Sequence, residues 1–368
     1  MIFIVGGTLA LFFELLLLSK KNKDLCDKIL AFWMFIMGVH LFSYYLYTRE
    51  LYSAYPYLIG PASALPLIHG PLLFLYTGSV TRYFSKWKPI YLLHFLPVVV
   101  FMAIFFDFYV SSGNGEIKFI KNIFKNPYDL YRFNFPSILI SGFSYIFLTA
   151  LLFRRHKHNI LNNLSNSNEN NNLIWLRNLL SGMLLIWLIV LLSQFVLNSS
   201  IQDDLIYITV SLFVVFIGFF GLRQGNIFVN LPDNCLIEGL IEENQPRYSR
   251  SGLKEEQAAE IEHKLAELME HRKLFIDENI SLPSLAGLMN VHPNYLSQVI
   301  NERFKKNFYE FINSYRVEEF KSKVSVEKNR NKTFFALSLD CGFNSKASFN
   351  SSFKKITGIT PSEFVKSL

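Results

Sequence analysis

The clearest pattern lies in two stretches near the C-terminus: residues 281–304, SLPSLAGLMNVHPNYLSQVINERF, and residues 333–358, TFFALSLDCGFNSKASFNSSFKKITG. In the first, apolar residues recur at helical spacing on both sides of a turn at residues 289–291. In the second, Gly342 supplies the turn and Gly358 ends the second helix. Each stretch is therefore predicted to form a helix, a tight turn and a second helix.

Polar residues mark the outer face of the second helix in each stretch. One such pair of helices could simply pack, but two in tandem favour the arrangement that lays a helix in the major groove of DNA. The predicted outward positions are Asn294, Tyr295, Ser297, Gln298, Asn301 and Arg303 in the first unit, and Ser345, Lys346, Ser348, Asn350, Ser351 and Lys354 in the second. Phosphate contacts are predicted for Asn301, Arg303, Lys305, Lys306, Ser345 and Lys354.

Charge also distinguishes this region from the helix before it. Residues 280–368 hold 13 Lys and Arg against seven acids, a net charge of +6, as expected where DNA binds. A helix is predicted over residues 253–275, where apolar residues recur three and four apart. Residues 253–280 carry eight acids against four bases. This connector helix is predicted to pack on the tail without touching DNA, and whether it also dimerises or relays a signal stays open.

The N-terminal part of the chain is far more apolar. The 368 residues are 51% hydrophobic and 18% charged, with a mean hydropathy of +0.25, which is too apolar for a soluble protein of this size. A membrane core of about 30 Å needs roughly 20 apolar residues in a helix. Seven spans are predicted, at residues 3–18, 29–47, 57–80, 90–110, 136–153, 173–197 and 205–222.

Basic residues in the short loops predict the orientation of these spans. They follow the first, third, fifth and seventh spans: Lys20, Lys21, Lys23, Lys28, Arg82, Lys86, Lys88, Arg154, Arg155, Lys157 and Arg223. Residues 111–135 are the exception, because they hold four basic residues yet fall outside. The N-terminus is predicted outside and the C-terminal part in the cytoplasm.

Ionisable residues within the predicted spans are costly in hydrocarbon and are candidates for sensing. The candidates are Glu14, His40, His69 and His94, with Asp107 near a span end. A position near the membrane interface is the alternative for these residues. The three cysteines, Cys26, Cys235 and Cys341, show no paired spacing, which argues against a disulfide framework or a zinc site. No catalytic constellation, metal site or cofactor is predicted.

The C-terminal region resembles a known family. The segments that carry the resemblance are residues 295–301 (YLSQVIN), 311–316 (FINSYR), 341–350 (CGFNSKASFN) and 353–361 (FKKITGITP). They are similar to the C-terminal domain of AraC/XylS-type transcription regulators, and the membrane part resembles the membrane-bound bacterial members. Ser338, Phe320 and His292 depart from the family's usual residues.

This resemblance implies two helix-turn-helix units that read adjacent major-groove segments on one face of DNA and recruit or activate RNA polymerase. The base-reading positions it implies are Asn294, Ser297, Gln298, Lys346, Ala347, Asn350 and Ser351.

Together these patterns predict an all-α protein that is not an enzyme. Its expected parts are a seven-helix transmembrane bundle (1–222), a linker (223–252), the connector helix (253–280) and a cytoplasmic double helix-turn-helix domain (281–368). The predicted function is a transcription regulator of the cytoplasmic membrane. Its expected partners are double-stranded DNA, RNA polymerase, the lipid bilayer, a small-molecule or protein signal, and a second copy of the chain. The alternative is a membrane receptor or scaffold whose helical tail binds a protein.

Overall fold

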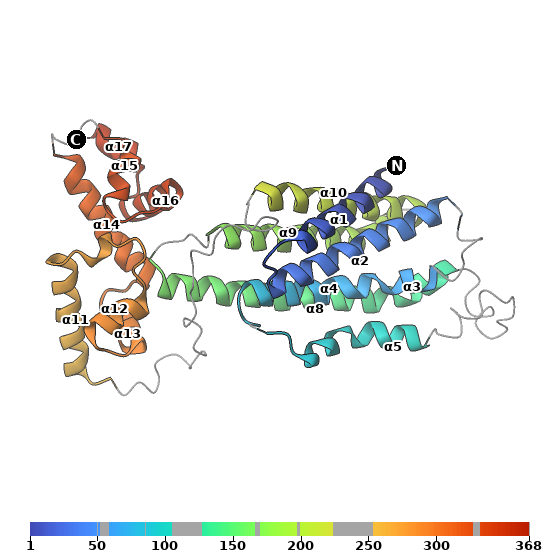
Figure 1. Cartoon of the computed structure of the whole chain (residues 1–368), viewed down its shortest axis with the longest axis horizontal. Helices are drawn as coiled ribbons and strands as arrows, with labels where there is room; N and C mark the ends of the chain where they lie inside the picture. The colour runs from blue at the N-terminus through green and yellow to red at the C-terminus, as the bar shows by residue number, and fades with distance from the viewer. Residues whose placement is uncertain are drawn as a thin grey trace. The chain divides into compact units, whose positions relative to one another are not determined.

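A computed structural model describes residues 1–49, 51, 59–84, 86–104, 127–165, 170–196, 199–223, 253–326 and 332–367. Every named element in these residues is a helix, so the all-α prediction is confirmed for them (Figure 1). The chain forms two compact units: Met1–Arg154 with Asn172–Asn234, and Arg155–Asn171 with Cys235–Leu368. Residues 155–171 therefore belong to the second unit, although most of α9 and all of α10, which come later in the chain, belong to the first.

The first unit is a bundle of apolar helices, coloured blue to yellow in Figure 1. Its elements are α1 (Ile2–Ser19), α2 (Leu25–Thr48), α3 (Ile59–Ala64), α4 (Pro66–Val80), the 3-10 helix η3 (Pro89–Phe95), α5 (Leu96–Ile104), most of α8 (Pro127–Asn163), most of α9 (Asn170–Val196) and α10 (Ser199–Arg223). One continuous apolar core joins side chains of α1, α2, α4, α8, α9 and α10.

The prediction of seven membrane spans is wrong for the described residues. Five helices there are long and apolar enough to cross a membrane: Ile2–Ser19, Leu25–Thr48, Phe135–Asn163, Ile174–Ser193 and Asp203–Phe220. They correspond to the first, second, fifth, sixth and seventh predicted spans. These apolar helices are compatible with insertion in a membrane.

Prolines explain the break in the predicted third span. Pro66 has no backbone N–H, so it cannot continue the hydrogen bonding of α3, and α4 begins there as a new helix. The 15 residues of α4 extend about 22 Å at 1.5 Å per residue. That length is short of a hydrocarbon core of about 30 Å.

The predicted fourth span, residues 90–110, starts as the tight 3-10 helix η3 and continues as α5. Its apolar helical part covers Pro89–Ala103, and residues 105–110 lie outside the described part of the chain.

The second unit contains the C-terminal helices, coloured orange to red in Figure 1. They are α11 (Glu255–Glu270), the 3-10 helix η4 (Leu274–Ile276), α12 (Leu282–Met289), α13 (Pro293–Arg303), α14 (Phe308–Val324), α15 (Phe334–Leu339), α16 (Lys346–Thr357) and α17 (Pro361–Lys366). One apolar cluster joins α11, α12, α13 and the start of α14, and a second joins the end of α14 with α15 and α16. Since α14 contributes to both clusters, it ties the two together.

Local sequence signals set several of these helix ends. Gly358 adopts a left-handed conformation and ends α16, as predicted. The Thr360 side chain accepts from the Glu363 backbone N–H, while the Glu363 side chain accepts from the Thr360 N–H at the start of α17. These reciprocal bonds satisfy two amide groups that the first helical turn would leave unpaired.

The two left-handed glycines of this unit should respond differently to substitution. Gly342 and Gly358 have φ values of +93° and +82°. A Cβ at Gly342 would lie 2.5 Å from the Phe275 carbonyl oxygen, whereas one at Gly358 would meet no atom of the described residues within 4 Å. Gly358→Ala should cost about 1–2 kcal/mol in backbone strain. Gly342→Ala should cost more, because backbone carbonyls must also move. Denaturant unfolding of the full-length variants measures both losses, and equal losses would contradict this packing.

Candidate functional site

Two helix-turn-helix units lie in the second compact unit: α12 with α13, and α15 with α16. Asn290 ends α12 in a left-handed conformation (φ +56°), and the chain turns directly into α13. In the second helix-turn-helix unit, the turn passes through Gly342 to Ser345. The Ser345 hydroxyl accepts from the Ser348 N–H at 3.2 Å and caps the start of α16. The helix α14 packs against both units and therefore links α13 to α16.

The helix α16 presents an exposed stripe that is polar except for one alanine. Lys346, Ala347, Asn350, Ser351 and Lys354 are all exposed. Their spacing of three and four residues places them on one face of the helix. Lys346, Asn350, Ser351 and Lys354 lie outward as predicted, Ala347 is exposed beside them, and Ser345 is half-buried at the helix start.

Ser348 was predicted on this face and is instead buried. Its hydroxyl lies 3.2 Å from the Tyr309 hydroxyl, and the Ser352 hydroxyl lies 3.1 Å from the same oxygen. These two serines fix α16 to α14 on the side away from the polar stripe.

The corresponding face of α13 is less open. Asn294 is exposed, and Ser297 and Asn301 are half-buried, with the Asn301 amide donating to the Ser297 carbonyl at 2.8 Å. The prediction that Gln298 faces outward is wrong: its side chain is buried and its NH₂ group donates to both Glu302 carboxylate oxygens at 3.2 Å. Gln298 can reach a base edge only if it leaves Glu302.

Arg303, a predicted phosphate contact, is paired within the protein. Its guanidinium donates to Glu255 and lies 3.7 Å from Glu262, both on α11. The hydrogen bond to Glu255 raises the pKa of Arg303. The acidic connector helix therefore neutralises part of the positive charge at the end of α13. Lys305 remains exposed and Lys306 is half-buried.

The three residues that depart from the family pattern have structural roles. The ring nitrogen Nδ1 of His292 accepts from the Asn294 N–H at 3.2 Å and caps α13. Phe320 is fully buried, with its ring 4.6 Å from that of Phe349. Ser338 is fully buried and donates to the Phe335 carbonyl.

In the first compact unit, two of the predicted sensing residues belong to one hydrogen-bonded chain. Trp33 Nε1 donates to His69 Nδ1 at 3.1 Å, and His69 Nε2 lies 3.1 Å from His40 Nδ1. His40 Nε2 lies 2.9 Å from the Tyr207 hydroxyl. The chain links α2, α4 and α10. The Tyr207 ring stacks on Tyr44 with centroids 3.7 Å apart.

The direction of each hydrogen bond between Trp33, His69, His40 and Tyr207 follows from the indole donor of Trp33. An indole nitrogen only donates, so His69 Nδ1 must accept and His69 Nε2 carries the proton. His40 Nδ1 then accepts from His69, and His40 Nε2 donates to Tyr207. A proton added to His40 would bring two N–H groups face to face between the rings. The chain is therefore formed by neutral imidazoles and would have to rearrange if either one gained a proton.

The other candidates for sensing lie outside this chain. Glu14 is half-buried on α1. His94 on η3 lies 3.0 Å from the Tyr145 hydroxyl on α8. Asp107 lies outside the described residues.

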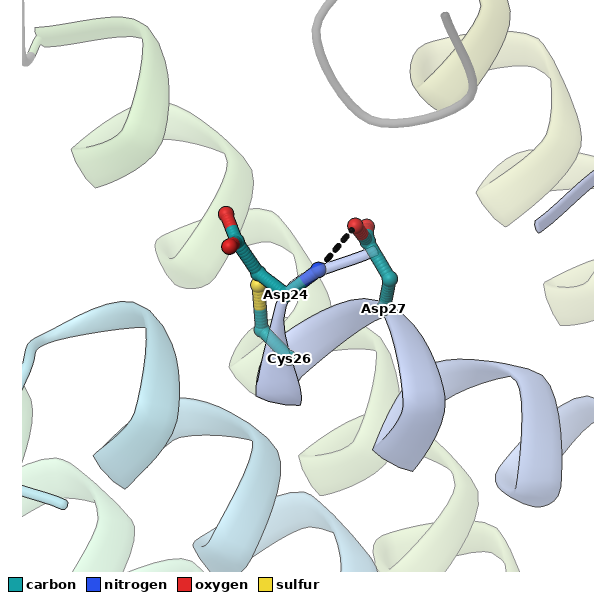
Figure 2. Close-up of side chains that lie close together, drawn as sticks. All are labelled: Asp24, Cys26 and Asp27. Carbon is teal, nitrogen blue, oxygen red and sulfur yellow. Dashed lines mark hydrogen bonds between the residues drawn. The ribbon is translucent and has the colours of Figure 1, made fainter. Parts of the chain in front are cut away.

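Figure 2 shows Asp24, Cys26 and Asp27, whose ligand-type atoms lie within 4.8 Å of one another at the start of α2. Sequence spacing gave no sign of this group. Asp27 accepts from the Asp24 backbone N–H at 3.1 Å and pairs with Lys20 at 2.8 Å. Both Asp27 oxygens are thus engaged by the helix start and by a cation, and we assign the group a structural role.

Comparison with known proteins bears on the C-terminal region. Residues 285–367 match the model of a helix-turn-helix domain family. This match supports an AraC-type helix-turn-helix domain and double-stranded DNA as its partner. The matched residues run from α12 to α17 and include both helix-turn-helix units.

Two further comparisons add little. A solved structure of a protein of unknown function from Listeria innocua is 26% identical, with 29% of this chain and 95% of that chain covered and a TM-score of 0.25. That TM-score is too low to support an argument about the fold. A search of curated proteins found no match.

The hydrogen-bonded chain makes a prediction about stability. Trp33→Phe should leave His69 Nδ1 buried without its donor, a loss of about 1–3 kcal/mol. Trp187→Phe is the matched control, because its indole nitrogen is buried without a hydrogen-bond partner in the described part of the protein. Thermal unfolding of both variants in detergent should show the larger loss for Trp33→Phe. Equal losses of stability in the two variants would contradict a hydrogen bond from Trp33 to His69.

The pairing of Arg303 predicts a change in DNA binding. Glu255→Gln should remove one of the two carboxylates paired with the Arg303 guanidinium. It should tighten binding to nonspecific duplex DNA and steepen the dependence of log K on log salt by up to about one unit. Glu256→Gln is the control, since it changes the net charge equally on the same helix. Salt titrations of the full-length variants test this. The idea fails if Glu256→Gln has the same effect.

Proposed function

We propose that this chain is a membrane-bound transcription regulator that binds specific double-stranded DNA through α13 and α16. The observation that carries the proposal is the exposed polar stripe of α16, within residues that match a helix-turn-helix family. A helix with such a face can lie in the major groove and contact base edges.

In this proposal the second helix-turn-helix unit, α15 with α16, makes more of the contacts to base edges than the first. Lys346 can donate to guanine, and the Asn350 amide can pair with adenine, because both side chains are exposed on one face. Ala347 can contact a thymine methyl group, and Ser351 can bond to either type of base. Ser345 and Lys354 lie at the two ends of the helix, where phosphates would pass.

The first helix-turn-helix unit, α12 with α13, has fewer exposed polar side chains for contact with DNA. Asn294 is exposed at the start of α13 and Ser297 lies one turn further along. Gln298 would join them by exchanging Glu302 for a base edge, since it donates to that carboxylate in the free protein. Asn301 and the lysines after the helix would contact phosphates. We propose that this unit adds affinity and register, while α16 provides most of the sequence discrimination.

The remaining parts of the proposal concern the membrane and other partners. The five apolar helices would lie in the cytoplasmic membrane, with the DNA-binding domain on the cytoplasmic side, as the basic loops indicate. Bound at a promoter, the domain would recruit RNA polymerase. Two copies of the chain would place two such domains on neighbouring sites.

We assign the sensing role to the chain of Trp33, His69, His40 and Tyr207. It links three helices of the first unit by side-chain hydrogen bonds. Buried polar networks of this kind have few alternative arrangements, so a small molecule or protein that disturbs one bond shifts the helices. Such a signal controls the protein only if it binds two states of the bundle with different affinity.

The proposal predicts specific DNA occupancy in the cell. Crosslinking of the full-length protein should recover discrete promoter segments. Lys346→Ala with Asn350→Ala should lose them, because each base contact contributes about 1–3 kcal/mol of discrimination. The matched control is Lys366→Ala with Asn279→Ala, which removes the same two exposed side-chain types elsewhere in the domain.

Discrete peaks that survive the control and vanish in the Lys346/Asn350 variant would support the proposal. If purified protein bound cellular protein with little salt dependence, and no DNA was recovered, the tail would be a protein-binding module instead.

A further inference from the structure

The helix α8 is much longer than a membrane requires. It runs for 37 residues, and its predicted apolar span ends at residue 153. The ten residues Arg154 to Asn163 that follow include the basic run Arg154, Arg155, His156, Lys157 and His158. At 1.5 Å per residue, this extension reaches about 15 Å beyond the apolar part.

The residues directly after α8, Leu164 and Ser165, are built into the second compact unit. Leu164 forms an isolated antiparallel bridge with Ser281, the residue that caps α12. Ser165 is 1% exposed, and its hydroxyl donates to the Ile280 carbonyl at 2.7 Å. The Asn313 amide on α14 donates to the Ser165 carbonyl at 3.0 Å. We call these two residues the docking segment.

The docking segment also supplies acceptors for a buried charged side chain. Arg316 on α14 is fully buried, and burial lowers its pKa to about 10, so the guanidinium stays charged at neutral pH. Its Nη1 donates to the Ser165 carbonyl and its Nη2 to the Ser165 hydroxyl, both at 3.2 Å. The other acceptors are the Phe275 and Asp277 carbonyls and the Asn313 side chain.

These contacts lie between the two helix-turn-helix units. Ile280 and Ser281 begin the first unit, and α14 connects the first unit to the second. The guanidinium of Arg316 also lies 5.8 Å from the centre of the Phe343 ring. Phe343 belongs to the apolar cluster that joins the end of α14 with α15 and α16. A displacement of Ser165 would therefore act on both units at once.

The order of the helices agrees with this docking. Between Ser165 and α11 the chain contains α9 and α10, both of which include a membrane-length apolar stretch. Two crossings return the chain to the side it left. The docking segment and α11 thus fall on the same side of a membrane, whatever the number of crossings before α8.

We propose that the docking segment is the joint through which the membrane helix α8 controls the DNA-binding domain. A shift of α8 would move Ser165 against Ile280, Asn313 and Arg316 and so change how α13 and α16 are held relative to each other. The sequence alone leaves open whether the connector helix, residues 253–275, relays a signal. The consequence for DNA rests on the proposed function, whereas the docking contact does not.

The test disturbs α8 and observes the joint by hydrogen exchange of the full-length protein in lipid nanodiscs, without DNA. Gly142 on α8 packs so closely that an added Cβ would lie 2.4 Å from the Trp187 ring. Gly142→Ala should therefore displace α8. Gly182→Ala is the matched control, because its Cβ would lie 2.4 Å from the Phe213 ring in the contact of α9 with α10.

Ser165→Ala should speed amide exchange about tenfold in residues 276–281 and 313–317. Amide exchange within α16 should stay unchanged, because a shift of the whole helix keeps its internal hydrogen bonds. Gly142→Ala should speed exchange several-fold in the same peptides, and Gly182→Ala should not. Adding Gly142→Ala to Ser165→Ala should have no further effect.

Three results would overturn the proposal. They are equal effects of the two glycine variants, no effect of Ser165→Ala, and a uniform rise over residues 253–367 in Ser165→Ala, which would make the segment an ordinary part of the domain core. The measurement contains no DNA, so its failure is distinct from a failure of promoter binding.

Discussion

The second compact unit depends on the hydrogen bonds that the buried guanidinium of Arg316 donates. A charged group without solvent is stable only if its N–H groups find acceptors, because a buried donor left unpaired costs about 1–3 kcal/mol and more when it is charged. Here the acceptors come from Ser165, Phe275, Asp277 and Asn313, which lie far apart in the sequence. The charge thus joins the end of α8, the turn before α12 and the helix α14. Any rearrangement of these segments has to keep those acceptors in place or replace them.

A polar constraint of another kind acts in the membrane-type bundle. The indole donor of Trp33 fixes the proton positions on His69 and His40, and Tyr207 completes the chain. Both networks join segments far apart in the sequence by directional bonds in buried surroundings, where apolar contacts alone would tolerate sliding. Each compact unit therefore contains a polar network that joins segments far apart in the sequence.

Much of the helix pattern could be predicted from the sequence, because local signals determine it. The turn glycines, Thr360 with Glu363, and the apolar spacing of α12, α13 and α16 each act within a few residues. The errors arose where a side-chain pairing decides the outcome. The Gln298 amide donates to Glu302 one turn further along α13, and Arg303 is paired by Glu255, which lies 48 residues earlier. Hydropathy alone overlooked the break at Pro66, and no local pattern singled out Ser165.

The position of Ser165 in the chain has a consequence for biosynthesis. The docking segment leaves the ribosome before α9 and α10, whereas Arg316 is made after both. The buried site can therefore close only once two membrane-length helices have been synthesised between its parts. A C-terminal fragment released by proteolysis would lack the two Ser165 acceptors and would carry an incompletely bonded guanidinium. Assembly of the reading domain is thus linked to completion of the bundle, which disfavours an active soluble fragment.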